Sequence, residues 1–139
     1  MPAKNIYHVV VIEALEADGW TITDDPLKMR YGGRDFYVDL GAERTPIGAE
    51  KGERKIAVEI QSFLNQSIVR DIEEAVGQYD VYRTLLQENE PKRSLYLAVP
   101  QRIRKALLVE PFGRLIVAKL NLSVIVFNEQ KKRIIEWTS

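Results

Sequence analysis

The chain has 139 residues, no cysteine, and 20 basic (Lys and Arg) and 20 acidic (Asp and Glu) residues. The lack of cysteine excludes disulfide frameworks, thiolate metal sites and cysteine nucleophiles, and the balanced charge argues against a broadly basic nucleic-acid coat. No apolar run is long enough for a transmembrane helix, and the first residues lack the layout of a signal peptide. We therefore expect a cytoplasmic protein without membrane association. Residues 1–139 contain no linker or internal repeat, which predicts a single domain.

Residues 4–18 have the spacing of a helix that ends at Gly19. A helical projection predicts that one apolar arc faces the core, made of Ile6, Val9, Val10, Ala14 and Ala17. Glu13 is an acid on that arc, whereas His8 lies on the polar side and is expected at the surface.

A hairpin is predicted next along the chain. "WTIT" (20–23) is typical of a short strand, and "LKMRY" and "RDFYVDLGA" flank a Gly-Gly turn. On the second arm, alternation puts Phe36, Val38 and Leu40 on one face and Asp35, Tyr37 and Asp39 on the other. Residues 42–54 are polar and contain two Gly and a Pro, which predicts a loop.

The stretch "IAVEIQSF" (56–63) predicts a buried strand that carries two polar groups. Alternation places Glu59 and Gln61 on one face and Ile56, Val58 and Ile60 on the other. An unpaired carboxylate in such a strand is costly, so a partner cation or a metal ion must compensate it.

The spacing of apolar residues at 67–88 predicts the longest helix of the chain, with Ser67 as its N-cap. Asp71, Gln78 and Tyr82 lie along one flank, and Asp71 is expected to be solvated. The predicted inward stripe is Ile68, Ile72, Ala75, Val76, Tyr79, Arg83 and Leu86.

Shorter elements complete the chain. The sequence predicts strands at 94–100, 122–128 and 133–137, the last at a sheet edge, and short helices at 101–108 and 112–120. Trp20 and Trp137 are expected to be packing residues. The order α-β-β-β-α-β predicts an α/β fold in which helices flank a mixed sheet.

Asp39 and Glu59 fall on adjacent predicted strands, where two desolvated carboxylates would repel and raise each other's pKa. A divalent cation such as Mg²⁺ or Mn²⁺ would relieve both penalties, and Mg²⁺ prefers one or two carboxylates with waters. Such a metal can activate water and shield charge on a phosphodiester. The alternative is that Arg34 or Lys55 pairs with these acids.

The Asp39, Glu59 and Gln61 pattern, after a helix with an inward Glu13, resembles the PD-(D/E)xK nuclease superfamily with its restriction-endonuclease-like fold. The resemblance implies that Asp39 and Glu59 bind the metal and that Glu13 is the first-helix acid of many members. Gln78 and Tyr82 are similar to the Q-x-x-x-Y element of some members, although both also suit a structural role.

Gln61 departs from the superfamily pattern, which has Lys at this position. A Gln can orient water by hydrogen bonding but supplies no positive charge to a developing anion. Lys51 and Lys55 are the nearby cations that would have to replace it.

Nearly the whole chain resembles the XisH family of cyanobacteria. The similarity rests on "MPAKNIYHVVVIEALEADGWTITDDPL", "VDLGAE", "KIAVEIQSF", "GQYDVYR" and "LYLAVP". That family is named for controlling excision of the fdxN element, a programmed DNA rearrangement. The resemblance implies a DNA-related role, a small XisI-like partner protein and a site-specific recombinase.

Three hypotheses remain open at this point: a metal-dependent endodeoxyribonuclease, a nuclease-shaped binding module without catalysis, and one half of a two-protein unit of the toxin and antitoxin kind. The basic clusters at 101–105 and 129–133 are read mainly as solvated surface, with nucleic-acid contact as the alternative. An exposed edge strand at 133–137 would permit pairing between subunits in a homo-oligomer.

Overall fold

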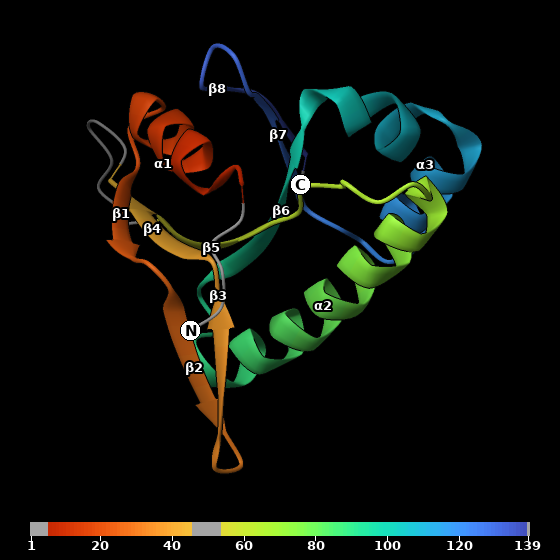
Figure 1. The fold of residues 1–139 in the computed structure, drawn as a ribbon. Coiled ribbons are helices and arrows are strands. Elements are labelled where there is room, and N and C mark those ends of the chain that lie inside the picture. Colours follow the sequence, from red (N-terminus) through yellow and green to blue (C-terminus); the bar gives the residue numbers. More distant parts are fainter. Residues whose placement is uncertain (1–5, 46–53, 139) are drawn as a thin grey trace.

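The computed structural model of the chain describes residues 6–45 and 54–138. The first half holds a helix, five strands and the long helix α2, and the second half holds the remaining strands and shorter helices (Figure 1). The elements are α1 (His8–Ala17), β1 (Thr21–Asp24), β2 (Leu27–Tyr31), β3 (Arg34–Val38), β4 (Leu40–Arg44), β5 (Arg54–Ile60), α2 (Ile68–Asn89), β6 (Ser94–Pro100), η1 (Gln101–Ile103), η2 (Lys105–Val109), α3 (Pro111–Lys119), β7 (Val124–Asn128) and β8 (Arg133–Thr138).

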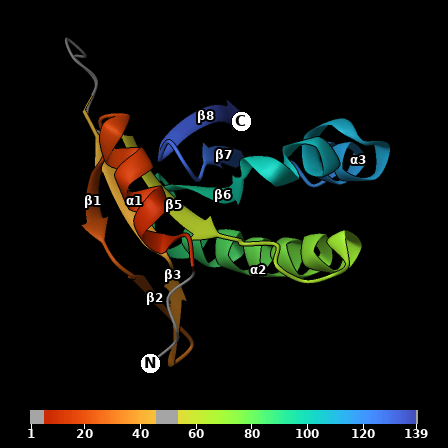
Figure 2. The same cartoon turned by 45° about the horizontal axis from the view of Figure 1, so that its top comes forward.

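Six strands form one sheet in the order β1-β4-β5-β6-β7-β8. The pairs β5–β6 and β6–β7 are parallel, and the remaining neighbours are antiparallel, so the sheet is mixed. Helices α1 and α2 lie on opposite faces of this sheet (Figures 1 and 2). This arrangement confirms the predicted restriction-endonuclease-like α/β fold, with β8 at a sheet edge as expected.

Strand β5 separates two apolar cores because its side chains alternate between the two faces. Ile56, Val58 and Ile60 pack in the core beneath α1. Ala57 packs in the core beneath α2, and Glu59 has the same orientation by alternation. The face that carries Glu59 and Gln61 is therefore the α2 face.

The predicted second hairpin arm is two strands rather than one. Strand β3 pairs only with β2 in a separate two-stranded sheet, whereas β4 belongs to the main sheet. The chain bends between them at Asp39. Val38 consequently packs in the α2-side core and Leu40 in the α1-side core, which corrects the expectation that both face one way.

The tight turn of the hairpin requires its two glycines. Gly32 and Gly33 have φ angles of +59° and +77°. Two consecutive residues in the left-handed region match the type I′ geometry that suits the twist of a hairpin. The "GG" signal therefore located this turn correctly.

The buried face of α1 differs from the predicted one. The helix buries His8, Val11, Ala14 and Leu15, whereas Ile6 and Val9 are 67% and 61% exposed. The segment "HVVVIEAL" is apolar on almost every side, so its periodicity does not select the inward face. Ala17 is also exposed.

His8 is buried and not at the surface as expected. Its Nε2 atom lies 2.7 Å from Oδ1 of Asp25, in the bend between β1 and β2. This contact fixes the start of α1 against the segment that leads into the hairpin. Its partner is 17 residues away, which is why the helical pattern alone could not reveal it.

Helix α2 confirms the predicted cap, because the Ser67 side chain accepts a hydrogen bond from the backbone N–H of Arg70. Asp71 is a correction: it is buried, not solvated, and accepts a hydrogen bond from Asn65 Nδ2 at 2.7 Å. The predicted loop at 42–54 is shorter, since residues 42–44 belong to β4. Residues 46–53 lie outside the described residues, as do positions 4 and 5 of the predicted first helix.

The remaining predicted elements are present with small changes. Residues 101–108 form a 3₁₀ turn and a π-helical turn rather than one short helix, and α3 follows directly. Trp20 and Trp137 pack against each other with ring centroids 5.7 Å apart, as expected for packing residues. Among the described residues, no helix has the combined length and apolarity that spanning a membrane requires.

Candidate active site

Asp39 and Glu59 are brought into direct contact, as the sequence predicted. The backbone N–H of Asp39 donates to Oε1 of Glu59 at 3.2 Å, and the backbone N–H of Ile60 donates to Oδ2 of Asp39 at 2.8 Å. Asp39 occupies the bend between β3 and β4, and Glu59 lies near the C-terminal end of β5. The strand break and the β4–β5 pairing together place both carboxylates on the α2 face of the sheet.

The environment of Glu59 disfavours its charged form. The residue is only 6% exposed, and the pKa of its carboxyl group is raised from 4.5 to about 9. Burial is the largest cause, followed by repulsion from the Asp39 carboxylate and a hydrogen bond between the two side chains, whereas the hydrogen bond from the Asp39 backbone lowers this pKa. Without a metal, the pair therefore keeps a proton on Glu59 at neutral pH.

Gln61, Gln78 and Tyr82 border the carboxylate pair. The side-chain amide of Gln61 donates to Oε1 of Gln78 at 2.5 Å, which links the end of β5 to α2. Burial raises the pKa of Tyr82, and the nearby carboxylates of Glu59 and then Asp39 add to this shift. The two predicted auxiliary residues thus face the predicted acids from α2.

Glu13 does not join this group. Helix α1 packs on the opposite face of the sheet, and Oε2 of Glu13 lies 3.2 Å from Nζ of Lys132 in the turn before β8. Within residues 6–45 and 54–138, no three or more His, Asp or Glu side chains are arranged to hold a metal ion. The predicted third acid is therefore absent from the site that the structure forms.

The alternative ion-pair partners do not compensate the acids. Lys55 lies 3.6 Å from Glu43, its cross-strand neighbour on β4. In the described part of the chain, neither Lys55 nor Arg34 is within ion-pair distance of Asp39 or Glu59. Lys51, the other candidate cation, lies outside the described residues.

Arg102 is a positioning residue that the sequence did not reveal. Its guanidinium donates to the carbonyl oxygens of Ser62 and Phe63, the two residues that follow Gln61. Phe63 has a φ of +53°, so the chain turns sharply there. The partners are about 40 residues apart in the sequence, and the basic cluster at 101–105 indicated only a charged surface.

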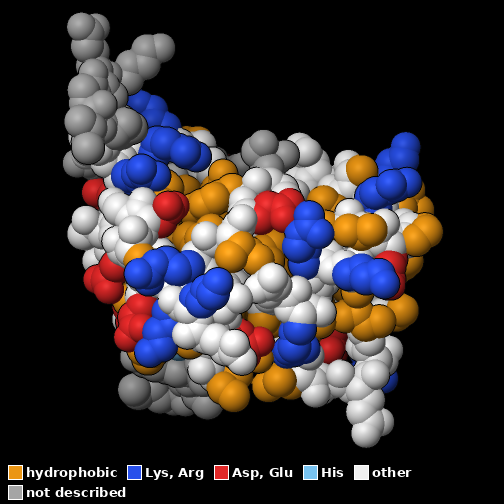
Figure 3. Space-filling view, turned by 90° about the horizontal axis from the view of Figure 1, so that it is seen from above, with side chains coloured by type: hydrophobic (Ala, Val, Ile, Leu, Met, Phe, Trp, Pro, Cys, Tyr) orange, Lys and Arg blue, Asp and Glu red, His pale blue; other side chains and the backbone are white. Residues whose placement is uncertain are grey.

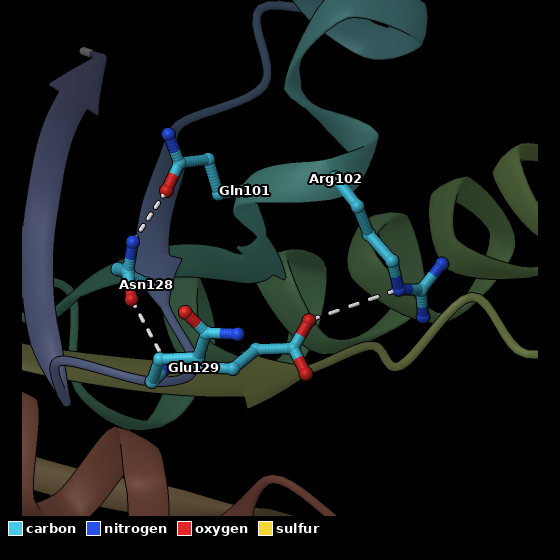
Figure 4. A pocket seen from close by; sticks show the side chains of 5 residues that line it. Gln101, Arg102, Asn128 and Glu129 are labelled. Atoms are coloured by element: carbon cyan, nitrogen blue, oxygen red, sulfur yellow. Dashed lines mark hydrogen bonds and ion pairs between the residues drawn. The ribbon is translucent and has the colours of Figure 1, made fainter.

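A hollow of about 340 Å³ next to η1 is closed by its own polar contacts (Figure 4). Asn128 donates to Gln101 at 2.7 Å, and Arg102 lies 3.8 Å from Glu129. These side chains satisfy each other, so the hollow is a less suitable ligand site than the acid pair.

The described residues on the molecular surface seen from above form no continuous basic stripe. Lys and Arg side chains are spread over this face and lie among acidic and apolar ones (Figure 3). Arg104, from the predicted basic cluster, pairs with Glu136 at 2.6 Å. Any nucleic-acid contact on this face would be local and would not involve a broad charged surface.

The residues of the pair fit a divalent cation. Two carboxylates in contact, one of them buried, supply the oxygen ligands that Mg²⁺ and Mn²⁺ prefer. A cation would replace the proton that otherwise remains on Glu59. Gln61 can then orient a water molecule, but its amide carries no charge.

The chain is similar to known proteins both in sequence and in structure. Its residues 1–135 match the family model described as XisH protein. A search of curated proteins found no significant match.

Two crystal structures are similar over nearly the whole chain. One is of a XisH family protein from Nostoc punctiforme, with 35% identity, a TM-score of 0.86, and coverage of 97% of this chain and 100% of that one. The other is of an fdxN element excision controlling factor protein from Anabaena variabilis, with 36% identity, a TM-score of 0.85, and coverage of 98% and 100%. The chain belongs to the XisH family.

Proposed function

We propose that this protein is a controlling factor for the programmed excision of a DNA element, and that it acts through a metal-dependent nuclease site at Asp39 and Glu59. Family membership and the similar excision controlling factor from Anabaena variabilis support the first part. The observation that carries the second part is the contact between Asp39 and the buried Glu59.

Each residue of the site has a definite task in this proposal. Asp39 and Glu59 hold Mg²⁺ or Mn²⁺, which supplies an activated water and shields charge on a DNA phosphodiester. The backbone N–H of Ile60 holds one Asp39 oxygen at 2.8 Å and so orients that carboxylate. Gln61 orients the attacking water, and Gln78 fixes the Gln61 amide.

Cleavage of DNA in the presence of metal tests this proposal. The substrates are supercoiled, linear and single-stranded DNA, each with Mg²⁺, Mn²⁺ or a chelator. We expect cleavage that requires metal and that Asp39→Asn abolishes, whereas Glu73→Gln, an exposed acid on α2, cleaves like the wild type. Cleavage that Asp39→Asn leaves intact would contradict the assignment.

A specific observation favours a second function, a DNA-binding or protein-binding module that keeps the nuclease shape without catalysis. Gln61 replaces the superfamily Lys, and its amide is already engaged by Gln78. In this function no DNA form is cut and the metal has no role, while loss of the protein still impairs excision. An excision assay with Asp39→Asn separates the two functions, because only the nuclease needs Asp39.

The partners follow from the same proposal. DNA is the substrate or ligand, and a XisI-like protein and a site-specific recombinase are the protein partners, all of which would be met in the cytoplasm. Co-purification of the protein with a XisI-like protein tests the first of the two protein associations. Retention of the complex at high salt would separate a specific interface from charge-driven contact.

A further inference from the structure

A second pocket lies at the other end of β5, on the α1 face of the sheet. It has a volume of about 450 Å³, which is within the usual range for small-molecule sites. Its walls come from the end of α1, the ends of β4 and β8, and the starts of β1, β5 and β6. The residues that matter here are Asp18, Trp20, Arg44, Arg54, Tyr96 and Trp137.

Two arginines face each other across the strands at this pocket. Arg44 on β4 and Arg54 on β5 are direct partners in the antiparallel register, and both side chains are exposed. Like charges directly opposite each other destabilise a sheet. Over the described residues, neither guanidinium has a carboxylate within ion-pair distance, so no described side chain supplies the pair with an anion.

Trp20 holds both guanidinium groups in place. The guanidinium carbons of Arg54 and Arg44 lie 5.7 and 6.0 Å from the centre of its ring. Stacking on an aromatic face leaves the N–H groups at the edge of a guanidinium free to donate. Two such forks side by side suit an anion with several oxygens, such as a phosphate group.

A partly buried aromatic ring borders the same pocket. Trp137 is held by Trp20 at 5.7 Å and by the edge of Tyr96 at 5.1 Å between ring centroids. A fixed, partly exposed indole provides a surface on which a nucleobase can stack. The Asp18 carboxylate also lines the pocket and can accept a hydrogen bond from an amino group of a base.

The pocket is separate from the acid pair. Arg54 and Glu59 are five residues apart on β5, which corresponds to about 17 Å along the strand. Their side chains also point to opposite faces, because residues 54 and 59 have opposite parity in the strand. A ligand in the pocket therefore cannot touch Asp39 or Glu59.

We propose that this pocket binds a nucleotide through its phosphate group and its base, with the phosphate between Arg44 and Arg54 and the base against Trp137. The combination of two arginines that no described carboxylate pairs with and a partly exposed indole favours a nucleotide over an acidic protein segment, which would need no stacking surface. Both a free nucleotide and the terminal nucleotide of a DNA strand carry this chemistry. The proposal does not depend on metal binding at Asp39 and Glu59.

Intrinsic fluorescence offers a direct test, because Trp20 and Trp137 are the only two tryptophans in the chain and both line the pocket. The probes are a deoxynucleoside monophosphate, the matching nucleoside, a short single-stranded DNA with and without a 5′-phosphate, and an acidic peptide. We expect saturable quenching by the phosphorylated probes and much weaker quenching by the unphosphorylated ones. Tighter binding of the phosphorylated strand than of the monophosphate identifies a strand end, whereas binding of the monophosphate without binding of either strand identifies a free nucleotide.

The matched variants are Arg44→Gln with Arg54→Gln, and Arg70→Gln as the control, since Arg70 is exposed on α2 outside the pocket. We expect the double variant to lose about tenfold or more in affinity and the control to lose nothing. Unchanged thermal unfolding of the double variant excludes misfolding. If the double variant does not fold, the single variant Arg54→Gln replaces it in the binding measurement.

Two results would overturn the proposal: no quenching by any phosphorylated probe, or equal affinity in the double variant and the control. Preferential binding of the acidic peptide would also overturn it and would assign the pocket to a protein partner. Glu59→Gln must retain nucleotide binding, and the double variant must retain metal binding. Failure here is therefore distinguishable from failure of the metal site.

Discussion

Glu59 is the residue on which the proposed metal site depends. Its carboxyl group is buried beside a second carboxylate, so the free protein holds a proton there that a solvated glutamate would have released. A group of this kind reduces stability as it is forced to ionise. Its retention in a core strand is understandable if a divalent cation takes the place of the proton.

Replacing Glu59 with Gln should therefore change how stability depends on pH. The folded pKa is raised from 4.5 to about 9, so the folded state binds more protons between these values, and the free energy of unfolding falls as pH rises through this window. Glu59→Gln removes this dependence on pH. The free energy of unfolding of the variant, relative to that of the wild type, should therefore increase by up to about 1.4 kcal/mol for each pH unit within this window.

Urea unfolding across that pH window, with a chelator present, measures the difference. Glu73→Gln, at an exposed position on α2, is the control and should follow the wild-type slope. Parallel curves for Glu59→Gln and the wild type would show that Glu59 ionises normally in the folded protein.

Gln61 decides between catalysis and binding alone. Gln61→Lys places an ammonium group next to Asp39 and Glu59 and supplies the charge that the amide lacks. We expect any metal-dependent cleavage to increase, on the order of a hundredfold, as for a restored group that stabilises a developing anion. Cleavage rates of Gln61→Lys and Gln61→Ala measure this effect.

Gln61→Ala is the matched control, because it also removes the hydrogen bond to Gln78 but adds no charge. A gain in both variants would assign the effect to the loss of that hydrogen bond. Complete inactivity of Gln61→Lys on every DNA form would favour the binding module over the nuclease.

At the scale of elements, two features form the candidate site: the bend of the chain at Asp39 and the alternation of side chains along β5. The chain leaves the β2–β3 hairpin and enters the main sheet at Asp39, which orients that carboxylate toward β5. Alternation along β5 directs Glu59 to the same face. Arg102 of η1 then fixes the segment after Gln61 through two backbone carbonyls.

Two helix glycines differ sharply in their surroundings, which gives a test at this scale. A Cβ atom at Gly113 of α3 would lie 2.1 Å from the carbonyl oxygen of Ala106, whereas one at Gly77 of α2 would meet nothing within 4 Å. Gly113→Ala should destabilise by about 1–3 kcal/mol through overpacking of backbone. Gly77→Ala should stabilise by up to about 1 kcal/mol through helix propensity.

Urea unfolding of both variants measures these opposite signs. The pair is internally matched, since each change adds one methyl group to a helix. Equal stability of Gly113→Ala and the wild type would mean that α3 does not pack on η2 as closely as described.

At the scale of the whole molecule, two faces of one sheet carry different chemistry. The acid pair lies beneath α2 at the C-terminal end of β5, and the arginine and tryptophan pocket lies on the α1 face at its N-terminal end. The same strand supplies Glu59 to one and Arg54 to the other. In the function proposed above, these two separated sites would allow the protein to engage two different ligands at once.

The sequence was sufficient for the order of elements and for the contact between the acids. Apolar runs and turn residues located the strands, and the Ser67 cap located α2, because these signals are local. Alternation also predicted that Asp39 and Glu59 share a face. Periodicity placed Gln78 and Tyr82 on one flank of the helix, and the structure brings Gln78 to Gln61 and Tyr82 close to the two acids.

Other features depend on contacts between distant residues and were missed for that reason. The nearest turn residue to Asp39 is Gly41, but Gly41 lies inside β4 and so does not mark the position of the bend. The inward face of α1 is set by the sheet that it covers and by the Asp25 partner of His8. The placement of Glu13 against Lys132 follows from that rotation and from the packing of α1 near β8.

The most direct test of the proposed metal site is a calorimetric titration of Mg²⁺ and Mn²⁺ into the wild type and Glu59→Gln, in two neutral buffers of different ionisation enthalpy. We expect saturable binding with release of close to one proton per metal, because the cation displaces the proton held on Glu59. Both the binding and the proton release should be lost in Glu59→Gln. Absence of metal binding in the wild type, or equal binding in the variant, would contradict a metal site at Asp39 and Glu59.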